Sequence, residues 1–586
     1  MKEVLKITIN GTKKYILGIL VCSLISSFLT IHLTKFIAFA IDGVIMQTSN
    51  LPEYITNSFY NNDIKSRLIV LALYMIIFVI TICVSNYIKN LFSTKFKVIM
   101  NRNLKKQLLE HTTYLEYGEY INYGKAQILQ RVSNDANNFV EFVSSKYNLF
   151  INSLFILVFS IIEILNLNIM VSIVIGIIII IIAIMSVVYF KLTKKIVHKN
   201  INLHEDLISK TMNAVYNPKM IKIFNRQLKE IDDFNKVSDE YRKNDKKLID
   251  YLIYYEVIGT GLRRFKDPAI FLFGGIFIIN GLMNIGALMV LMTYSSNLLE
   301  YVLQIIYAVE GINEFLVPAM RINKFLQLKE ENKEEKDLVI ENVSLEFKNV
   351  SAYINKVNIL NNISFKIEKG QTVYLVGDNG SGKSLIIRIL LGFIEYKGEI
   401  LLGGINIKEL NRSIIRKYIG VVFQEPFVFS DTIKNNIDVF QNYKDIEQIK
   451  KLAKICELDN EINSLPNKYD EILGERGINL SGGQKQRISI ARTLLQNKNI
   501  VIFDDVLSKV DNTTKEKIKE NLKTYNQDKI TIFITQDLAK IPENETVFFI
   551  DNKTITINTQ KNLKENNEHY KKLINICNDI VGDLNE

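Results

Sequence analysis

Long apolar runs fill much of the chain before about residue 310 and are missing from the rest of it. A helix needs about 20 mostly apolar residues to cross the hydrocarbon layer of a membrane. The first run is too long for a signal-peptide core and has no small-residue cleavage pattern, so it predicts a retained membrane helix. The fifth reaches spanning length only together with an amphipathic lead-in. The runs predict six spans, at residues 15–41, 68–88, 149–165, 169–190, 255–282 and 285–309.

Basic residues distinguish the two sides of this predicted membrane domain. They crowd the long connections at 89–146 and 191–250, whereas the short turns at 166–168 and 283–285 carry none. By the positive-inside rule, the long connections and both termini are cytoplasmic, and so is everything after the sixth span. The pattern therefore predicts a multi-pass protein of the cell (plasma) membrane whose first partner is the lipid bilayer.

The polar half of the pattern divides the chain into domains. Helical apolar spacing at 96–111 and 203–229 predicts that membrane helices continue into the cytosol. Residues 1–326 are therefore predicted to form an all-α six-helix transmembrane domain with long cytoplasmic helix extensions. A charged stretch at 327–338 has no core pattern and is predicted to be a linker. Residues 339–586 alternate short strands with helices, which is typical of an α/β domain.

Composition narrows this picture only slightly. The formal net charge is +10, from 72 Lys and Arg against 62 Asp and Glu. Much of that charge lies in the connections next to the predicted spans, where it needs no nucleic-acid partner. The four cysteines are scattered without paired spacing, so neither a disulfide framework nor a zinc site is predicted.

A phosphate-binding motif lies early in the second domain. It fits the P-loop pattern G-x-x-x-x-G-K-[ST] and stands between a predicted buried strand and a predicted helix, as that pattern requires. Its glycines let backbone N–H groups point inward at phosphate oxygens, and its Lys-Ser pair argues against a plain glycine turn. The motif predicts ATP and Mg²⁺ as cofactors, with the lysine on the β- and γ-phosphates and the serine on the metal. Its residues are Gly377, Asp378, Asn379, Gly380, Ser381, Gly382, Lys383 and Ser384.

Polar residues elsewhere in this domain suit the same chemistry. Tyr353 precedes the P-loop on a strand-like segment, where it either stacks on a purine base or lies in the core. Gln424 follows a strand and suits contact with Mg²⁺ and water. Asp504 and Asp505 end another buried strand. We expect Asp504 in the Mg²⁺ shell, and Asp505 where a base for the attacking water would lie.

The segment Leu480-Ser481-Gly482-Gly483-Gln484 precedes a helix and forms a second candidate anion site. Together with the P-loop, Gln424 and the Asp504 strand, it resembles the nucleotide-binding domain of ABC transporters, whose signature is Leu-Ser-Gly-Gly-Gln. Six spans ahead of one such domain resemble an ABC half-transporter of the exporter type. The resemblance covers nearly the whole chain, and the segments Gly474–Gly477 and Phe427–Ile433 also follow the exporter pattern.

The resemblance implies a dimer of nucleotide-binding domains paired head to tail. ATP then lies between the P-loop of one domain and the signature of the other. This implies that Ser481, Gly482, Gly483 and Gln484 contact the nucleotide of the partner, and that Asp511 closes the Asp-loop Ser508–Asp511. The resemblance also puts coupling helices near 117–123 and 213–219, facing the nucleotide-binding domains.

Two residues depart from the family pattern on the same catalytic surface. Asp505 stands where the family usually has Glu as general base, and Gln536 stands where a His contacts the γ-phosphate. No His occurs anywhere between His204 and His569. A displacement near ~1 Å costs about 100-fold in rate, and Asp is one methylene shorter than Glu. We therefore expect slow ATP hydrolysis at this chain's own site, and a second half-transporter as heterodimer partner; a homodimer with a competent Asp505 is the alternative.

Polar residues in the membrane half are candidates for contact with a transported substrate. Five of them share a face of the sixth predicted span, and four charged ones precede the apolar part of the fifth. One interpretation is that they line a polar cavity in which Glu300 faces the translocation path. The other is that they form helix–helix hydrogen bonds and anchor the helices at the membrane interface. The residues are Thr293, Ser296, Asn297, Glu300 and Gln304, with Arg263, Arg264, Lys266 and Asp267.

The function expected from these features is ATP-driven export of an unidentified substrate. An importer on the same fold is one alternative. Another is an ATP-regulated membrane protein or channel that does not pump, because a fold alone does not determine function.

Overall fold

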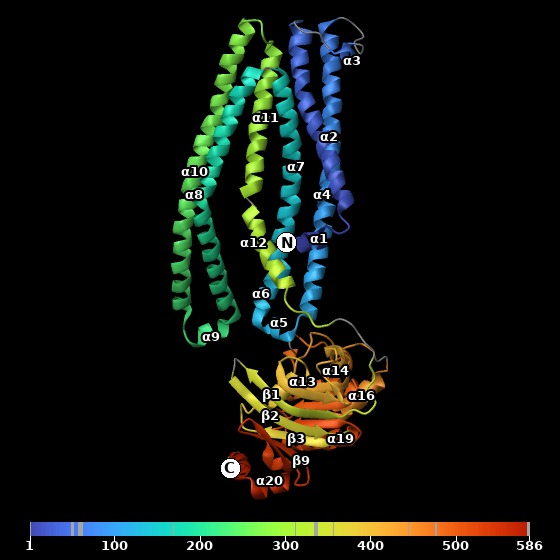
Figure 1. Cartoon of the computed structure of the whole chain (residues 1–586). Coiled ribbons are helices and arrows are strands. Elements are labelled where there is room, and N and C mark those ends of the chain that lie inside the picture. Colours follow the sequence, from blue (N-terminus) through green and yellow to red (C-terminus); the bar gives the residue numbers. More distant parts are fainter. Residues whose placement is uncertain are drawn as a thin grey trace. The chain divides into compact units, whose positions relative to one another are not determined.

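The computed structural model describes residues 2–47, 52–56, 63–167, 169–310, 312–332, 338–354, 357–442, 445–474 and 477–582. Contacts divide the chain into two compact units. The first is Met1–His111 with Ala126–Gln327, and the second is Thr112–Lys125 with Leu328–Glu586. The first is helical and the second mixes strands with helices, so the predicted order of a helical domain and an α/β domain is confirmed (Figure 1).

The first unit is built from long helices. Its principal helices are α2 (Lys13–Ala38), α4 (Ile64–Tyr114), α7 (Ala136–Leu167), α8 (Ile169–Tyr216), α10 (Gln227–Ile279) and α11 (Ile285–Glu310). Its shorter elements are α1 (Lys2–Ile9), η1 (Phe39–Ile45), α3 (Glu53–Thr56), α6 (Lys125–Gln130), η2 (Arg131–Asp135), α9 (Pro218–Ile223) and α12 (Ile312–Leu326).

Three helical stretches are long and apolar enough to cross a membrane, within the residues that the structure describes. They are Lys13–Ile45, Ile64–Tyr114 and Lys125–Leu167, and they contain the first three predicted spans. The other three predicted spans lie along α8, α10 and α11, and their crossing of the membrane stays a prediction.

One predicted helix is interrupted. The spacing at 203–229 predicts continuous helix, but α8 ends at Tyr216 and the short α9 follows. Pro218 begins α9, and a proline disfavours helical backbone at the residue before it, here Asn217. The break therefore falls where the sequence has the only proline of this connection, at a predicted coupling segment.

Helix pairs hold the first unit together. Helices α8 and α10 lie side by side, and α7 packs against both α2 and α11 (Figure 1). Tyr294 of α11 is fully buried in this packing, and its hydroxyl donates a hydrogen bond to the Ile31 carbonyl at 2.9 Å. Lys35 pairs with Glu163 at 2.7 Å, so a charge pair also joins α2 to α7.

The second unit contains two sheets. The smaller is antiparallel, in the order β2-β1-β4-β5, and the larger has the order β10-β9-β3-β8-β7-β6 with only β10 antiparallel to its neighbour. Strand β7 is buried along its whole length, as expected for a parallel strand covered on both faces. The strands are β1 (Leu345–Ile354), β2 (Val357–Ile367), β3 (Thr372–Gly377), β4 (Tyr396–Leu402), β5 (Ile405–Asn406), β6 (Ile419–Val422), β7 (Ile500–Asp504), β8 (Ile530–Ile534), β9 (Thr546–Asp551) and β10 (Thr554–Thr559).

Helices connect the strands of the second unit, and the parallel strands of the larger sheet all run in the same direction. The carboxyl ends of β3, β6, β7 and β8 meet at one edge of this sheet, which brings the residues after each strand together. The helices are α13 (Lys383–Leu390), α14 (Arg412–Tyr418), α15 (Ile433–Ile437), α16 (Ile446–Ile455), α17 (Asp459–Asn463), η3 (Lys468–Asp470), α18 (Gly482–Leu495), α19 (Asn512–Tyr525), η5 (Leu538–Lys540), α20 (Gln560–Asn566) and α21 (Glu568–Gly582).

One helix of the second unit comes from the first half of the sequence. Helix α5 (Tyr117–Tyr123) lies in the segment Thr112–Lys125, and its Tyr117 ring stacks on the Phe393 ring with centroids 4.1 Å apart. Leu115 forms an antiparallel bridge with Glu330 just before it. The first predicted coupling segment thus packs on the α/β unit.

Candidate functional site

The P-loop connects β3 to α13. Gly377 has φ 151° and Gly382, which caps α13, has φ 103°, so both use backbone conformations that favour glycine. A Cβ on Gly377 would lie 2.5 Å from the Ile550 carbonyl oxygen. Ser381 Oγ is buried, and it has no hydrogen-bond partner in the described part of the chain. A donor left over inside such a loop fits a phosphate oxygen.

Lys383 folds back across the loop. Its ammonium donates to the carbonyl oxygens of Gly377 and Asp378, at 2.7 and 2.8 Å. Burial lowers the pKa of Lys383, while the carboxylates of Asp378, Asp504 and Asp505 raise it. These two hydrogen bonds hold the Lys383 ammonium against the backbone of the loop. Of the other loop residues, Asn379 and Gly380 lie exposed at its crest.

Ser384 and Asp504, two of the predicted magnesium ligands, are in contact with each other. Ser384 Oγ donates to Asp504 Oδ2 at 3.1 Å. Burial raises the pKa of Asp504, and the Ser384 hydrogen bond and the charge of Lys383 lower it. Hydroxyl and carboxylate oxygens are the ligands that Mg²⁺ takes from proteins, so this pair would hold the metal of a Mg–ATP complex.

Asp505 lies beside Gln424. The Gln424 amide nitrogen donates to Asp505 Oδ2 at 3.2 Å, and the Asp505 backbone N–H donates to the Ile534 carbonyl at 2.9 Å. Burial raises the pKa of Asp505, and the Gln424 hydrogen bond opposes that shift. Asp505 has φ 49°, in the left-handed region, which Asp tolerates better than most residues. Strand pairing thus brings together two residues that the sequence suggested separately.

Tyr353 lies on β1, and Gln536 follows β8. The Tyr353 ring lies near Lys397, whose ammonium is 5.3 Å from the ring centroid, and its strand pairs it with Asn358. Tyr353 also lines a cavity of about 620 Å³ shared with α5 and Phe393. Gln536 is exposed, two positions after β8 ends. Their contacts with a nucleotide stay predictions.

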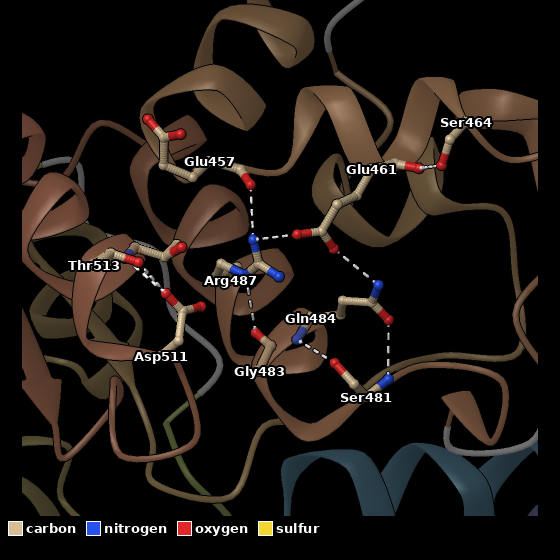
Figure 2. A network of polar contacts seen from close by, with 10 residues as sticks. Glu457, Glu461, Ser464, Ser481, Gly483, Gln484, Arg487, Asp511 and Thr513 are labelled. Atoms are coloured by element: carbon tan, nitrogen blue, oxygen red, sulfur yellow. Dashed lines mark hydrogen bonds and ion pairs between the residues drawn. The ribbon is translucent and has the colours of Figure 1, made fainter. Parts of the chain in front are cut away.

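The turn Ser481–Gln484 is tightly built (Figure 2). Ser481 caps α18 by accepting from the Gln484 backbone N–H at 3.2 Å, and Gln484 Oε1 accepts from the Ser481 N–H at 2.9 Å. This reciprocal pair is a capping box. Gln484 Nε2 also donates to Glu461 at 2.8 Å, and the other oxygen of Glu461 pairs with the buried Arg487 at 2.7 Å. A charged network therefore holds the helix N-terminus in place.

The same turn packs against the Asp-loop. A Cβ on Gly483 would lie 2.8 Å from the Lys509 carbonyl oxygen, and one on Gly482 would lie 2.8 Å from the Lys509 side chain. Asp511 caps α19 by accepting from Thr513 and Thr514, and these hydrogen bonds lower its pKa to about 2. Asp511 is therefore ionised at neutral pH. Residues Glu475 and Arg476, just before the turn, lie outside the described residues.

Comparison with known proteins agrees with this geometry. The family description "ABC transporter transmembrane region" matches residues 16–302, and "ABC transporter" matches residues 360–508. The chain is an ABC transporter. It carries the membrane and ATP-binding domains fused in one polypeptide, in a family that generally couples ATP hydrolysis to transport and whose exporters act as dimers in a membrane.

Individual relatives cover different parts of the transporter. YgaD of Bacillus subtilis, provisionally named a multidrug export ATP-binding/permease protein, is 24% identical over 577 residues, 97% of each chain. MdlA of Buchnera aphidicola, a multidrug resistance-like ATP-binding protein, is 44% identical over 200 residues, 34% of each chain. A solved bacterial Atm1-family ABC exporter with ATP bound has a TM-score of 0.81 at 19% identity, over 96% of this chain and 98% of that chain, which establishes the fold.

The membrane half of the transporter has a polar cavity at residues for which the sequence suggested either a cavity or helix–helix hydrogen bonds. Ser296, Glu300 and Gln304 of α11 line a space of about 460 Å³ with residues of α10. Lys266 is buried there, donating to Ser296 Oγ at 2.7 Å and pairing with Asp267. Arg264 also lines it, whereas the side chain of Arg263 lies outside the described ones. Thr293 and Asn297 are half-buried on the same helix, outside this lining.

Sequence reasoning missed one residue that contacts the P-loop. His569 on α21 lies between Asp378 of the loop, at 3.2 Å from Nε2, and Asp551 at the end of β9, at 3.0 Å from Nδ1. The partners are far apart in sequence and belong to no common motif, so only the fold brings them together. Glu461, which holds the signature turn, was missed for the same reason.

Proposed function

We propose that this chain is one half of a heterodimeric ABC exporter, and that its own P-loop site binds ATP but hydrolyses it slowly. The observation that carries the proposal is an asymmetry between two halves of the ATP-binding surface. The turn Ser481–Gln484, which would serve the partner's nucleotide, keeps every residue of the family signature and a full hydrogen-bond network. The surface that would act on this chain's own nucleotide departs at both Asp505 and Gln536.

ATP binding at the own site would use the residues of the P-loop. Lys383 and the loop N–H groups would contact phosphate oxygens, and Ser384, Asp504 and Gln424 would hold Mg²⁺. Bound Mg²⁺ neutralises charge on the phosphates. The buried Ser381 hydroxyl, with no partner of its own among the described atoms, supports a phosphate in this loop.

Hydrolysis at this site would depend on Asp505. A general base must reach the water that attacks the γ-phosphate, and geometry matters before pKa does. The side chain of Asp505 is one methylene shorter than that of Glu, and its carboxylate already accepts a hydrogen bond from Gln424. Gln536 lacks the titratable ring that the family uses next to the γ-phosphate. Together these features favour slow turnover at the own site and rapid turnover at the partner's.

The transported molecule would pass along α10 and α11. Glu300 and Gln304 line the polar cavity there together with Lys266. Charged residues inside a membrane domain cost free energy, and where they occur they commonly mark the path of a substrate. The substrate would thus meet a cavity with groups of both charges.

ATPase measurements on purified protein test the proposal. The chain alone is compared with the chain co-purified with the half-transporter encoded beside it. We expect activity only in the pair, abolished by replacing the partner's catalytic base and reduced by less than half by Asp505→Asn. Lys383→Ala in this chain is the control that removes ATP from the own site. Equal activity for the chain alone would mean that Asp505 is a competent base in a homodimer, and the heterodimer proposal would be wrong.

A further inference from the structure

A second polar pocket lies inside the membrane unit, and Glu300 is not among the residues that line it. It has a volume of about 390 Å³ and is built from four helices. Neutral polar side chains make up most of its wall, together with one apolar residue, one tyrosine ring and one cation. The lining residues are Ser26, Thr30, Asn86, Lys89, Asn90, Asn152, Ile156 and Tyr301.

The cation is Lys89 of α4, and it is nine-tenths buried. Its ammonium donates one hydrogen bond, to the Asn152 side-chain oxygen at 3.2 Å. Among the described residues no carboxylate lies within ion-pair distance of it. The other buried Lys and Arg side chains of this unit each pair with a carboxylate, Arg131 with Asp135 and Lys266 with Asp267, and the half-buried Lys35 pairs with Glu163.

A buried ammonium without a counter-charge is unfavourable. Desolvation of the charge costs free energy that one amide oxygen offsets only in part. An ammonium has three donors, and Lys89 uses one of them on the protein. The remaining ammonium donors and the neighbouring asparagine amide groups suit the oxygens of an anion. Lys89 is the one charged residue among those that line the pocket.

We propose that this pocket binds the anionic group of the transported molecule, a carboxylate, phosphate or sulfonate attached to an apolar body. The inference rests on the proposed export function and names a substrate class for it. Lys89 would pair with the anion, and Ile156 and the Tyr301 ring would contact the apolar part. Lys89 follows the cytoplasmic end of the second predicted span, so such a molecule would enter from the cytoplasmic side.

An anionic lipid head group presents the same chemistry. The pocket wall comes from α2, α4, α7 and α11 of this chain, which favours a small molecule inside the bundle over a lipid at its surface. The experiment therefore varies the lipid and the probe separately.

The test uses the transporter, with its partner subunit, in phosphatidylcholine nanodiscs. The probe is 1-anilinonaphthalene-8-sulfonate, and the matched control probe is N-phenyl-1-naphthylamine, which lacks the sulfonate. Binding is measured by fluorescence for wild type, Lys89→Gln, Lys89→Arg and Lys95→Gln. Lys95 is exposed on the same helix, so Lys95→Gln removes the same charge outside the pocket.

We expect Lys89→Gln to weaken sulfonate binding about tenfold, as the loss of a hydrogen-bonded charge implies. Lys89→Arg should keep the affinity within about threefold, and Lys95→Gln should match wild type. The uncharged probe should bind all four proteins alike. Equal sulfonate binding by wild type and Lys89→Gln would overturn the inference, and so would an equal loss of the uncharged probe.

Two further arms identify the occupant. If added phosphatidylglycerol displaces the sulfonate probe from wild type but not from Lys89→Gln, the pocket holds a lipid head group, and its assignment to a transported molecule is wrong. ATPase activity is measured on the same nanodiscs. If the transporter hydrolyses no ATP but its sulfonate binding depends on Lys89, the proposed function is contradicted and the pocket is not. If it hydrolyses ATP normally but its sulfonate binding does not depend on Lys89, the pocket is contradicted and the proposed function is not.

Discussion

At the scale of single residues, two adjacent aspartates have different surroundings. Asp504 accepts from Ser384, while Asp505 accepts from Gln424 on another strand end. Both carboxylates have raised pKa values because they are buried. Asp505 also adopts a left-handed backbone, which aspartate accepts more readily than glutamate. The departure from the family pattern therefore agrees with the local backbone.

Asp505→Asn should stabilise the nucleotide-free transporter at neutral pH. A pKa raised in the folded state means that the folded protein binds the proton more tightly than the unfolded one. The free-energy cost of burying the charged Asp505 carboxylate is therefore present above the raised pKa. This cost is relieved as the pH falls through that pKa. We expect a higher melting temperature than wild type at pH 7.5, and the difference should shrink as the pH is lowered.

The matched control for that melting experiment is Asp511→Ala. The pKa of Asp511 is lowered by hydrogen bonds from Thr513 and Thr514, so its charged form stabilises the fold. This variant should melt lower than wild type at neutral pH, the opposite sign to Asp505→Asn. If Asp505→Asn melts at or below the wild-type temperature at neutral pH, the account of Asp505 is wrong.

The charged network behind the signature turn gives another residue-scale prediction. Glu461→Gln weakens the contacts that hold Gln484 and the buried Arg487, so the N-terminus of α18 should lose its fixed position. ATPase activity of the dimer should fall severalfold, while a fluorescent ATP analogue should still bind the isolated chain through its P-loop. Glu447→Gln, which breaks an exposed pair with Lys450, is the control and should behave as wild type.

At the scale of elements, α5 is the segment whose packing is most informative. Its Tyr117 ring stacks on Phe393, and the Arg416 guanidinium lies 5.5 Å from the same Phe393 ring. Lys329 pairs with Glu116 at 2.8 Å just before the helix. This packing supports the coupling role expected from the family resemblance.

Tyr117→Ala should uncouple transport from hydrolysis. An aromatic pair contributes about 0.5–1.5 kcal/mol beyond its buried area, so docking of α5 should weaken about two- to tenfold. We expect ATPase activity to persist while substrate movement per ATP falls, measured in proteoliposomes. Tyr117→Phe keeps the stacked ring and should transport normally. Unchanged transport by Tyr117→Ala would argue against a coupling role for α5.

At the scale of the whole molecule, what could be predicted from sequence depended on distance along the chain. The P-loop and the signature turn are runs of consecutive residues, and the first three apolar runs need only helical length, so local patterns were enough for these features. The break before Pro218 also had a local signal, although the helical spacing on both sides obscured it. The contacts of His569 with Asp378, and of Gln484 with Glu461, join distant segments through strand order and helix packing, which one sequence does not reveal.

Helix α5 has a consequence for anyone who prepares the ATP-binding half by itself. A fragment that starts at Leu328 omits Thr112–Lys125, which packs with that half although it lies more than 200 residues earlier. Such a fragment would expose the Phe393 ring and the strand-like edge at Glu330, both attractive to other copies. A synthetic peptide of residues 112–125, added during purification, would supply the missing piece and should improve solubility.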